Sequence, residues 1–167
     1  AKSTPSHKRK TMKQNYLYEI LELSESQKNE LTAAFEKVLS VSGWINIEPF
    51  VEDDKRGETA GLFSWFSARG PQVPIGTLVF EGGEKLVSIG LSHGAGRNAS
   101  AILSDEGIEA PSTWQLKQDH PKRGFVWEVN KTEVDTNSAS TFLMEATYRL
   151  CLAAQERFWV VSVNHLN

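Results

Sequence analysis

Residues 92–99 (SHGAGRNA) combine an imidazole, two glycines and a guanidinium, a composition that can bind an anion. A glycine-rich turn can present several backbone N–H groups to a phosphate or carboxylate. Arg97 and a protonated His93 would add charge-assisted hydrogen bonds. The candidate anion-binding residues are therefore His93, Gly94, Gly96, Arg97 and Asn98. The alternative, favoured by the usual composition of loops, is that the glycines only turn the chain while Arg97 and Asn98 face water.

The same segment formally matches the dinucleotide fingerprint, with Gly94, Gly96 and Ala99 at its three small positions. That fingerprint needs a strand before it and a helix after it within a βαβ unit. Here the preceding strand belongs to an expected hairpin, so the context argues against a Rossmann site. We predict no cofactor.

Two further polar clusters have simpler explanations. Residues 119–123 (DHPKR) place an acid beside an imidazole, which would suit proton transfer. Adjacent residues at a hairpin tip rarely converge, however, so a solvated turn is favoured. The acidic residues within 52–58 lack the spacing of a calcium loop, and the histidines are scattered with no cysteine at ligand spacing. No metal site is predicted.

Nucleophilic catalysis finds no support in the motifs. The chain has neither a G-x-S-x-G elbow nor a Walker loop. Its single cysteine, Cys151, lies in the apolar run 150–154 (LCLAA), which predicts a buried and unreactive thiol. No catalytic residue is predicted, and the sequence leans away from an enzyme. Paired carboxylates stay open, because their proximity depends on the fold.

Residues 62–66 (LFSWF) are apolar on both faces of an expected strand. Phe63 and Trp65 share one face. Such a strand is either covered on both sides or exposed to a partner. Phe63 and Trp65 are therefore candidate partner-binding residues.

Composition points to one globular domain. The chain has 167 residues, 40% of them apolar and 23% charged, with a formal net charge of −3. Residues 1–13 contain cations and no acid, which predicts a disordered basic tail over 1–14 and a single α+β domain over 15–167. The tail could bind nucleic acid through counterion release, but a solvated tail is favoured because the body is slightly acidic and carries no nucleic-acid motif.

Location follows from two absences in the sequence. The single cysteine allows no intrachain disulfide, and no apolar stretch approaches the length of a membrane span. The sequence therefore favours the cytoplasm and no membrane contact.

Helical periodicity marks three segments. Recurring apolar residues over 16–21 predict a short first helix. A capping box at Ser24 and Gln27 begins a second helix over about 25–41, which Gly43 would end as a left-handed cap. A third helix is expected over about 138–157.

Between and after these helices the period changes to two. The strands are expected over 44–51, 60–67, 73–80, 85–92, 113–118, 124–129 and 158–163. Glycine pair 82–83 and residues 119–123 would turn two hairpins. The sequence therefore predicts an antiparallel, hairpin-rich α+β sheet of about five to seven strands, with the N-terminal and C-terminal helices packed on one face.

These observations favour a non-enzymatic protein-binding module, whether adaptor, chaperone-like or inhibitor-like, which could form a homo-oligomer. One alternative is an enzyme or sensor that binds a phosphate or other anion at 93–98. Another is weak nucleic-acid binding through the tail. The order of elements loosely resembles small secretion-chaperone-like or immunity-type proteins, and that resemblance concerns the fold alone.

Overall fold

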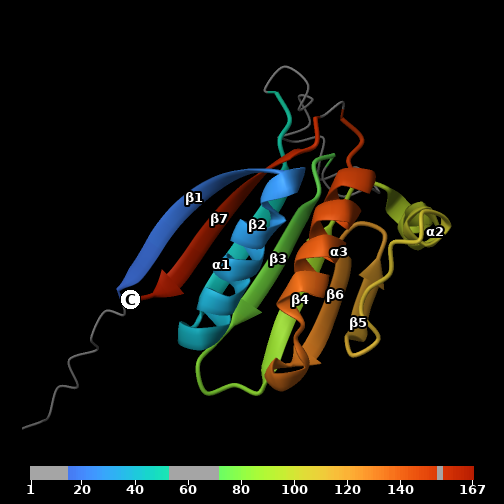
Figure 1. Ribbon diagram of the computed structural model, residues 1–167. Helices are drawn as coiled ribbons and strands as arrows, with labels where there is room; N and C mark the ends of the chain where they lie inside the picture. Colours follow the sequence, from blue (N-terminus) through green and yellow to red (C-terminus); the bar gives the residue numbers. More distant parts are fainter. Residues whose placement is uncertain (1–14, 53–71, 154–155) are drawn as a thin grey trace, which may run out of the picture.

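The computed structural model describes residues 15–52, 72–153 and 156–167. They form a curved antiparallel sheet with helices on one of its faces (Figure 1). The seven strands lie in the order β1-β7-β2-β3-β4-β6-β5. Their bounds are β1 Tyr16–Ser24, β2 Gly43–Pro49, β3 Ile75–Phe80, β4 Leu86–Ser92, β5 Gln115–His120, β6 Gly124–Asn130 and β7 Phe158–Leu166. The predicted α+β class is confirmed.

Two long helices, α1 (Lys28–Val41) and α3 (Thr136–Arg149), lie side by side across the sheet (Figure 1). A single 3₁₀ turn over 25–27 leads into α1, and there the Ser24 N–H donates to the Gln27 side chain over 2.9 Å. At the start of α3 the Asp135 carboxylate accepts from the Ser138 N–H. These caps satisfy N–H groups that have no partner within the helix.

The main core lies between these helices and the sheet. Side chains from α1, α3 and the helix-facing positions of the strands are fully buried there, among them Leu31, Phe35, Ile45, Leu78, Ile89, Leu143 and Val161. At Gly76 of β3 an added Cβ would lie 3.1 Å from the Leu143 side chain, so α3 packs tightly on the sheet at this glycine. A Thr32–Ser140 hydroxyl contact of 3.0 Å joins the two helices.

Aromatic rings fill the core near β5 and β6. Trp127 stacks on Phe125 and meets Phe142 of α3 edge-on. Trp114 contacts both Trp127 and Phe142 at centroid distances of 5.7 and 5.4 Å. Such offset and edge-to-face pairs are the preferred arrangements of aromatic rings.

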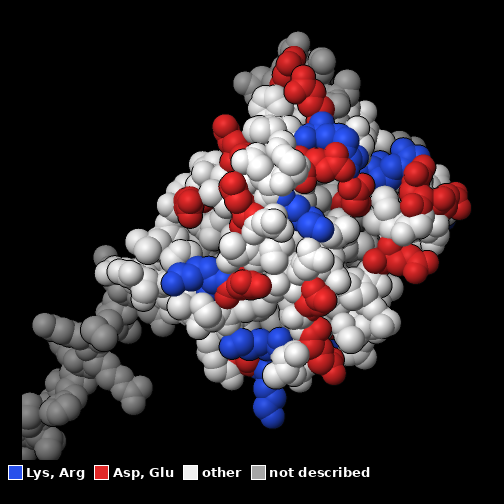
Figure 2. Space-filling view, viewed as in Figure 1, with Lys and Arg blue, Asp and Glu red and all other residues white. Residues whose placement is uncertain are grey.

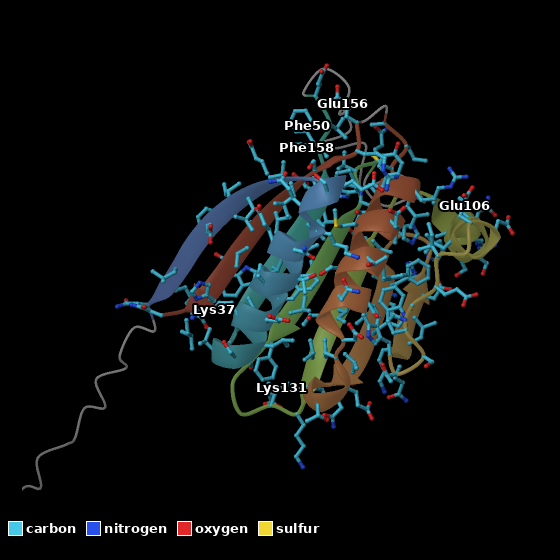
Figure 3. All side chains as sticks on the ribbon, in the orientation of Figure 1. Lys37, Phe50, Glu106, Lys131, Glu156 and Phe158 are labelled. Atoms are coloured by element: carbon cyan, nitrogen blue, oxygen red, sulfur yellow. The ribbon has the colours of Figure 1, made fainter. Side chains whose placement is uncertain are left out.

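The ends of the sheet carry smaller aromatic contacts (Figure 3). Phe50 and Phe158 lie together at one end, with their ring centroids 5.9 Å apart. At the opposite end the Lys131 ammonium lies 4.7 Å from the centre of the Phe80 ring. These contacts pack side chains together at the two ends of the strands.

The predicted first helix is wrong, because residues 16–24 form strand β1. All nine residues pair with β7. The sequence YLYEILELS fits a period of two as well as a helical one, and a single short helix has little stability alone. Pairing with a strand from the other end of the chain decided the structure.

The C-terminal prediction also needs correction. Helix α3 ends at Arg149, well before residue 157, and β7 runs to Leu166. Cys151 consequently lies beyond the helix and is half-buried, so its expected burial within the helix is wrong. After α3 the chain continues into β7, which lies between β1 and β2 in the sheet.

Two local features were missed at the other elements. Ser42, with φ 97°, makes the turn after α1, whereas Gly43 opens β2 and lies so close to β7 that its Cβ would meet the Asn164 carbonyl at 1.9 Å. The short helix α2 (Ala99–Asp105) was not predicted. It sits beside the sheet, where Glu106 at its end pairs with Arg149 of α3 at 3.0 Å (Figure 3).

Candidate functional site

The two faces of the sheet differ in what covers them. Successive strand residues point to opposite faces, and in β2 Ile45 and Ile47 point into the core while Trp44, Asn46 and Glu48 point away. The helix-covered side shows acidic and basic side chains interspersed on its outer surface (Figure 2). The described helices leave the other side, here called the open face, uncovered.

A groove of about 730 Å³ runs across the open face. It draws its lining from six neighbouring strands, β1, β7, β2, β3, β4 and β6. The lining residues are Tyr18, Ile20, Asn46, Glu48, Ile75, Thr77, Gly90, Leu91, Ser92, Arg123, Phe125, Val126, Val160 and Ser162. At about 4.8 Å between neighbouring strands, six strands span roughly 24 Å, so the groove is long as well as open.

Apolar side chains make up much of the groove surface. Ile75, Val126 and Val160 contribute from three separate strands. Gly90 keeps the floor hollow, because a Cβ there would lie 2.6 Å from the Thr77 hydroxyl oxygen. Any side chain at position 90 would displace Thr77 and fill part of the groove.

Polar groups are set around this apolar surface. Hydroxyls from Thr77, Ser92 and Ser162 and the amide of Asn46 line the groove. The Ser92 hydroxyl also fastens β4 to β3, because it accepts from the Ile75 N–H over 3.2 Å. Glu48 and Arg123 supply one charge of each sign among the lining residues.

Large exposed apolar side chains occur on the open face, of which Tyr18 and Ile20 line the groove and Trp44 and Leu86 do not. Tyr18 is 63% exposed, Ile20 55% and Leu86 50%. Trp44 is 37% exposed and its ring lies 5.0 Å from that of Tyr16. Trp44 thus differs from Trp114, Trp127 and Trp159, which are buried. Large exposed apolar side chains on one face are a feature of interaction sites.

The structure separates the predicted anion-binding residues. His93 is fully buried against Phe125 with a ring-centroid distance of 5.2 Å, whereas Arg97 and Asn98 are exposed. Gly96 has φ 65° and starts the 3₁₀ turn that leads into α2, and Gly94 is buried. The buried imidazole and the exposed guanidinium do not share a surface.

Burial lowers the pKa of His93 below its ordinary value, and the charge of Asp119 opposes this shift only partly. Neither ring nitrogen of His93 has a hydrogen-bond partner among the described residues. The neutral ring is therefore the stable form at neutral pH. This histidine behaves as a core residue.

Residues 121–123 form the turn between β5 and β6, and Asp119 and His120 are the last two residues of β5. The Nδ1 atom of His120 accepts hydrogen bonds from the backbone N–H groups of Lys122 and Arg123 at 3.1 and 3.0 Å. His120 therefore stabilises the turn that follows it, which is a structural role. The turn matters to the groove because it places Arg123 at the edge of the lining.

Several sequence predictions fall outside what can be compared. The described residues do not include the candidate partner-binding residues Phe63 and Trp65 or the tail 1–14. Of the acidic segment 52–58 they include only Glu52. Among the residues that are described, no three of the types His, Cys, Asp and Glu come together to hold a metal. No described helix is both long and apolar enough to cross a membrane.

Sequence reasoning missed the open face as a unit. Tyr18 and Ile20 were assigned to a helix, and the groove residues of β2, β3, β4 and β6 were not recognised as one surface. The usable signal was the alternation in 16–24, which puts Tyr16, Tyr18 and Ile20 on one side of a strand. Which strands lie next to β1 could not be known from that pattern.

Comparisons with known protein families, curated proteins and solved structures find no match to this chain.

Proposed function

We propose that this chain is a non-enzymatic protein-binding module that takes an extended apolar segment of a partner polypeptide into the groove on its open face. An adaptor, chaperone-like or inhibitor-like role would use such a site. The observation that carries the proposal is the groove itself, an open apolar trough that crosses six strands.

Length favours a polypeptide segment as the occupant. A trough of roughly 24 Å accommodates about seven residues of extended chain at about 3.3 Å per residue. A compact metabolite would leave much of it empty. Tyr18 and Ile20 of the lining are exposed, and Trp44, which lies outside the lining, extends the apolar contact beyond the trough.

The polar lining favours an extended segment over a helical one. A helix satisfies its own backbone, whereas an extended chain brings N–H and C=O groups that need partners when water is displaced. Asn46, Thr77 and Ser162 can supply those partners between the apolar side chains. Alternating apolar residues of the bound segment would then face the floor.

The test begins with selection of binding peptides from a display library of random peptides about twelve residues long. We expect the enriched peptides to carry aromatic or aliphatic residues at every second position. Their dissociation constants are then measured with synthetic peptides on three purified proteins: wild type, the double variant Val126→Thr/Val160→Thr, and Val79→Thr. Valine and threonine have nearly the same shape, so the double variant makes the floor polar with little change in volume.

The double variant should weaken peptide binding at least tenfold, because it removes apolar contact at two strands of the floor. Val79→Thr serves as the matched control, since Val79 is an exposed residue of the same face that does not line the groove. Equal binding by wild type and the double variant would refute the proposal. If no peptide is enriched and fatty acids raise the melting temperature of the protein, the groove is instead a small-molecule site.

A further inference from the structure

The two edge strands of the sheet are protected to different degrees. Strand β5 has six residues, a register shift between Leu116 and Gln118, and Lys117 within that shift. Bulges and lysines are features that prevent an edge from pairing with another chain. Strand β1 has nine residues in unbroken register with β7 and contains neither lysine nor proline. Strand β1 carries Glu19 and Glu22 but has no bulge, lysine or proline, so it is the less protected of the two edges.

The backbone of β1 has one set of groups directed away from the sheet. On β7 the Leu166 N–H donates to Ser42, and the Phe158 carbonyl accepts from Phe50, so the even-numbered residues of β7 bond toward β2. The Asn167 N–H donates to the Asn15 carbonyl, so the odd-numbered residues bond toward β1. Because these directions alternate along a strand, the N–H and C=O groups of Tyr18, Ile20 and Glu22 point outward.

Apolar side chains accompany these outward groups. Leu17 is 48% exposed, Tyr18 63% and Ile20 55%. In the part of the chain that the structure describes, no strand pairs with the outer edge of β1 (Figure 1). A long and apolar edge of this kind is a template for a further strand.

We propose that the outer edge of β1 pairs antiparallel with β1 of a second copy of this chain, in the register that places Ile20 opposite Ile20 of that copy. The two sheets then join into one continuous sheet across a two-fold axis. This pairing uses the strand edge and stands independently of the proposed function of the groove.

Self-complementarity of β1 identifies the occupant. The register centred on Ile20 overlaps the whole strand, because Tyr16 then faces Ser24 of the copy. It places Glu19 opposite Leu21 and Glu22 opposite Tyr18, so no carboxylate faces another. A register centred on Glu19 would set that carboxylate against its own copy, which is unfavourable. One centred on Leu21 would leave Tyr16 and Leu17 beyond the end of the partner strand.

Symmetry also limits the assembly. A two-fold interface uses the same patch on both copies and closes at the dimer. The bulged edge at β5 offers no equivalent template. Edge pairing through β1 therefore predicts a dimer and no filament.

Cysteine crosslinking tests the register. In a Cys151→Ser background, Ile20→Cys would face its own copy at a Cα separation of about 5.5 Å, within the range of a disulfide. Tyr18→Cys is the matched control, because its two copies would be offset by four residues, about 13 Å along the strands. Under mild oxidation Ile20→Cys should form a covalent dimer rapidly and Tyr18→Cys should not. Failure of both to crosslink, equal crosslinking, or preference for position 18 would overturn the proposal.

Proline substitution tests the pairing without altering the groove. Glu22 does not line the groove, and its N–H points outward and makes no hydrogen bond to β7. Glu22→Pro should therefore keep the fold, as judged by circular dichroism, but give a monomer by sedimentation. Glu22→Ala keeps the N–H and should remain dimeric, like wild type. A monomeric wild type at high micromolar concentration would overturn the proposal, and if Glu22→Pro does not fold, the crosslinking result decides.

The two proposals give separable results on one protein. Peptide affinity of the groove is measured on folded, monomeric Glu22→Pro. Loss of dimer with retained peptide binding supports the edge interface and the groove as separate sites. A dimer that binds no peptide refutes the proposed function alone.

Discussion

The candidate anion-binding residues of the segment 92–99 lie in different environments, because Arg97 is exposed and His93 is buried. His93 is fully buried and lacks a hydrogen-bond partner at either ring nitrogen among the described residues. Arg157, by contrast, is satisfied on both sides, because its guanidinium contacts Glu25 at 2.8 Å and Glu145 at 2.6 Å and lies over the Tyr148 ring. That residue ties the start of α1 to α3 and β7. The buried His93 ring therefore costs stability, whereas the Arg157 guanidinium holds several elements together.

We predict that His93 makes the protein less stable as the pH falls. Because burial lowers the folded-state pKa of His93 below its ordinary value of 6.5, the unfolded chain takes up a proton that the native state refuses. The free energy of unfolding should therefore decline once the pH drops through about 6.5, and continue to decline until the folded pKa is reached. Urea unfolding between pH 7.5 and pH 5 measures this decline.

His93→Phe should flatten that dependence, because it keeps a ring against Phe125 and removes the titrating group. Glu25, whose pKa is lowered by its hydrogen bond to Arg157, acts below its ordinary value of 4.5 and thus outside this window. An unchanged slope in His93→Phe would contradict the assignment.

Two strands of the sheet can approach each other closely where one of them has a glycine, because glycine has no side chain. Gly124 at the start of β6 has φ 81°, and a Cβ there would lie 2.3 Å from the Leu91 carbonyl oxygen of β4. Gly83, in the turn between β3 and β4, has a similar φ of 92°, yet a Cβ there would meet nothing within 4 Å. The same residue type thus serves close packing at one position and turn conformation at the other.

Alanine at these two glycines should separate the two effects. Gly83→Ala carries only the cost of a left-handed conformation, about 1–2 kcal/mol. Gly124→Ala carries that cost and also forces β4 and β6 apart, so we expect at least twice the loss in the free energy of unfolding, measured by chemical denaturation. Equal losses at both positions would show that the contact with Leu91 relaxes freely.

At the scale of the whole molecule, the last strand of the chain is placed inside the sheet. Strand β7 pairs with β1 along nine residues and with β2 along seven. The exposed residues Tyr18 and Ile20 reach the open face only because β7 holds β1 there. Groove, edge and core therefore all depend on a contact between the two ends of the described chain.

Removal of β7 should abolish the cooperative fold. A chain that stops after Glu156 leaves β1 without its partner and opens the edge of β2, so we expect loss of a cooperative thermal transition by circular dichroism. Adding a synthetic peptide of residues 156–167 should restore it. A chain that stops after Asn164 keeps most of β7 and should still melt cooperatively at a lower temperature. Retention of a full transition without β7 would contradict this view of the fold.

By itself the sequence determined the features that depend on neighbours along the chain. The capping box at Ser24 and Gln27, the stripe of α1 and the glycine pair of the β3–β4 turn are local interactions, and each predicted its element. The antiparallel α+β class followed from the order of those elements.

Only the tertiary structure decided the rest. Residues 16–24 are compatible with a helix or a strand, and pairing with β7 from the far end of the chain selected the strand. The groove collects alternate residues from six strands, so it exists only once the strand order is fixed. His93 and Arg97 are close in sequence, yet one lies in the core and the other in water. Local propensity is set by adjacent residues, whereas a surface is set by which distant segments pack together.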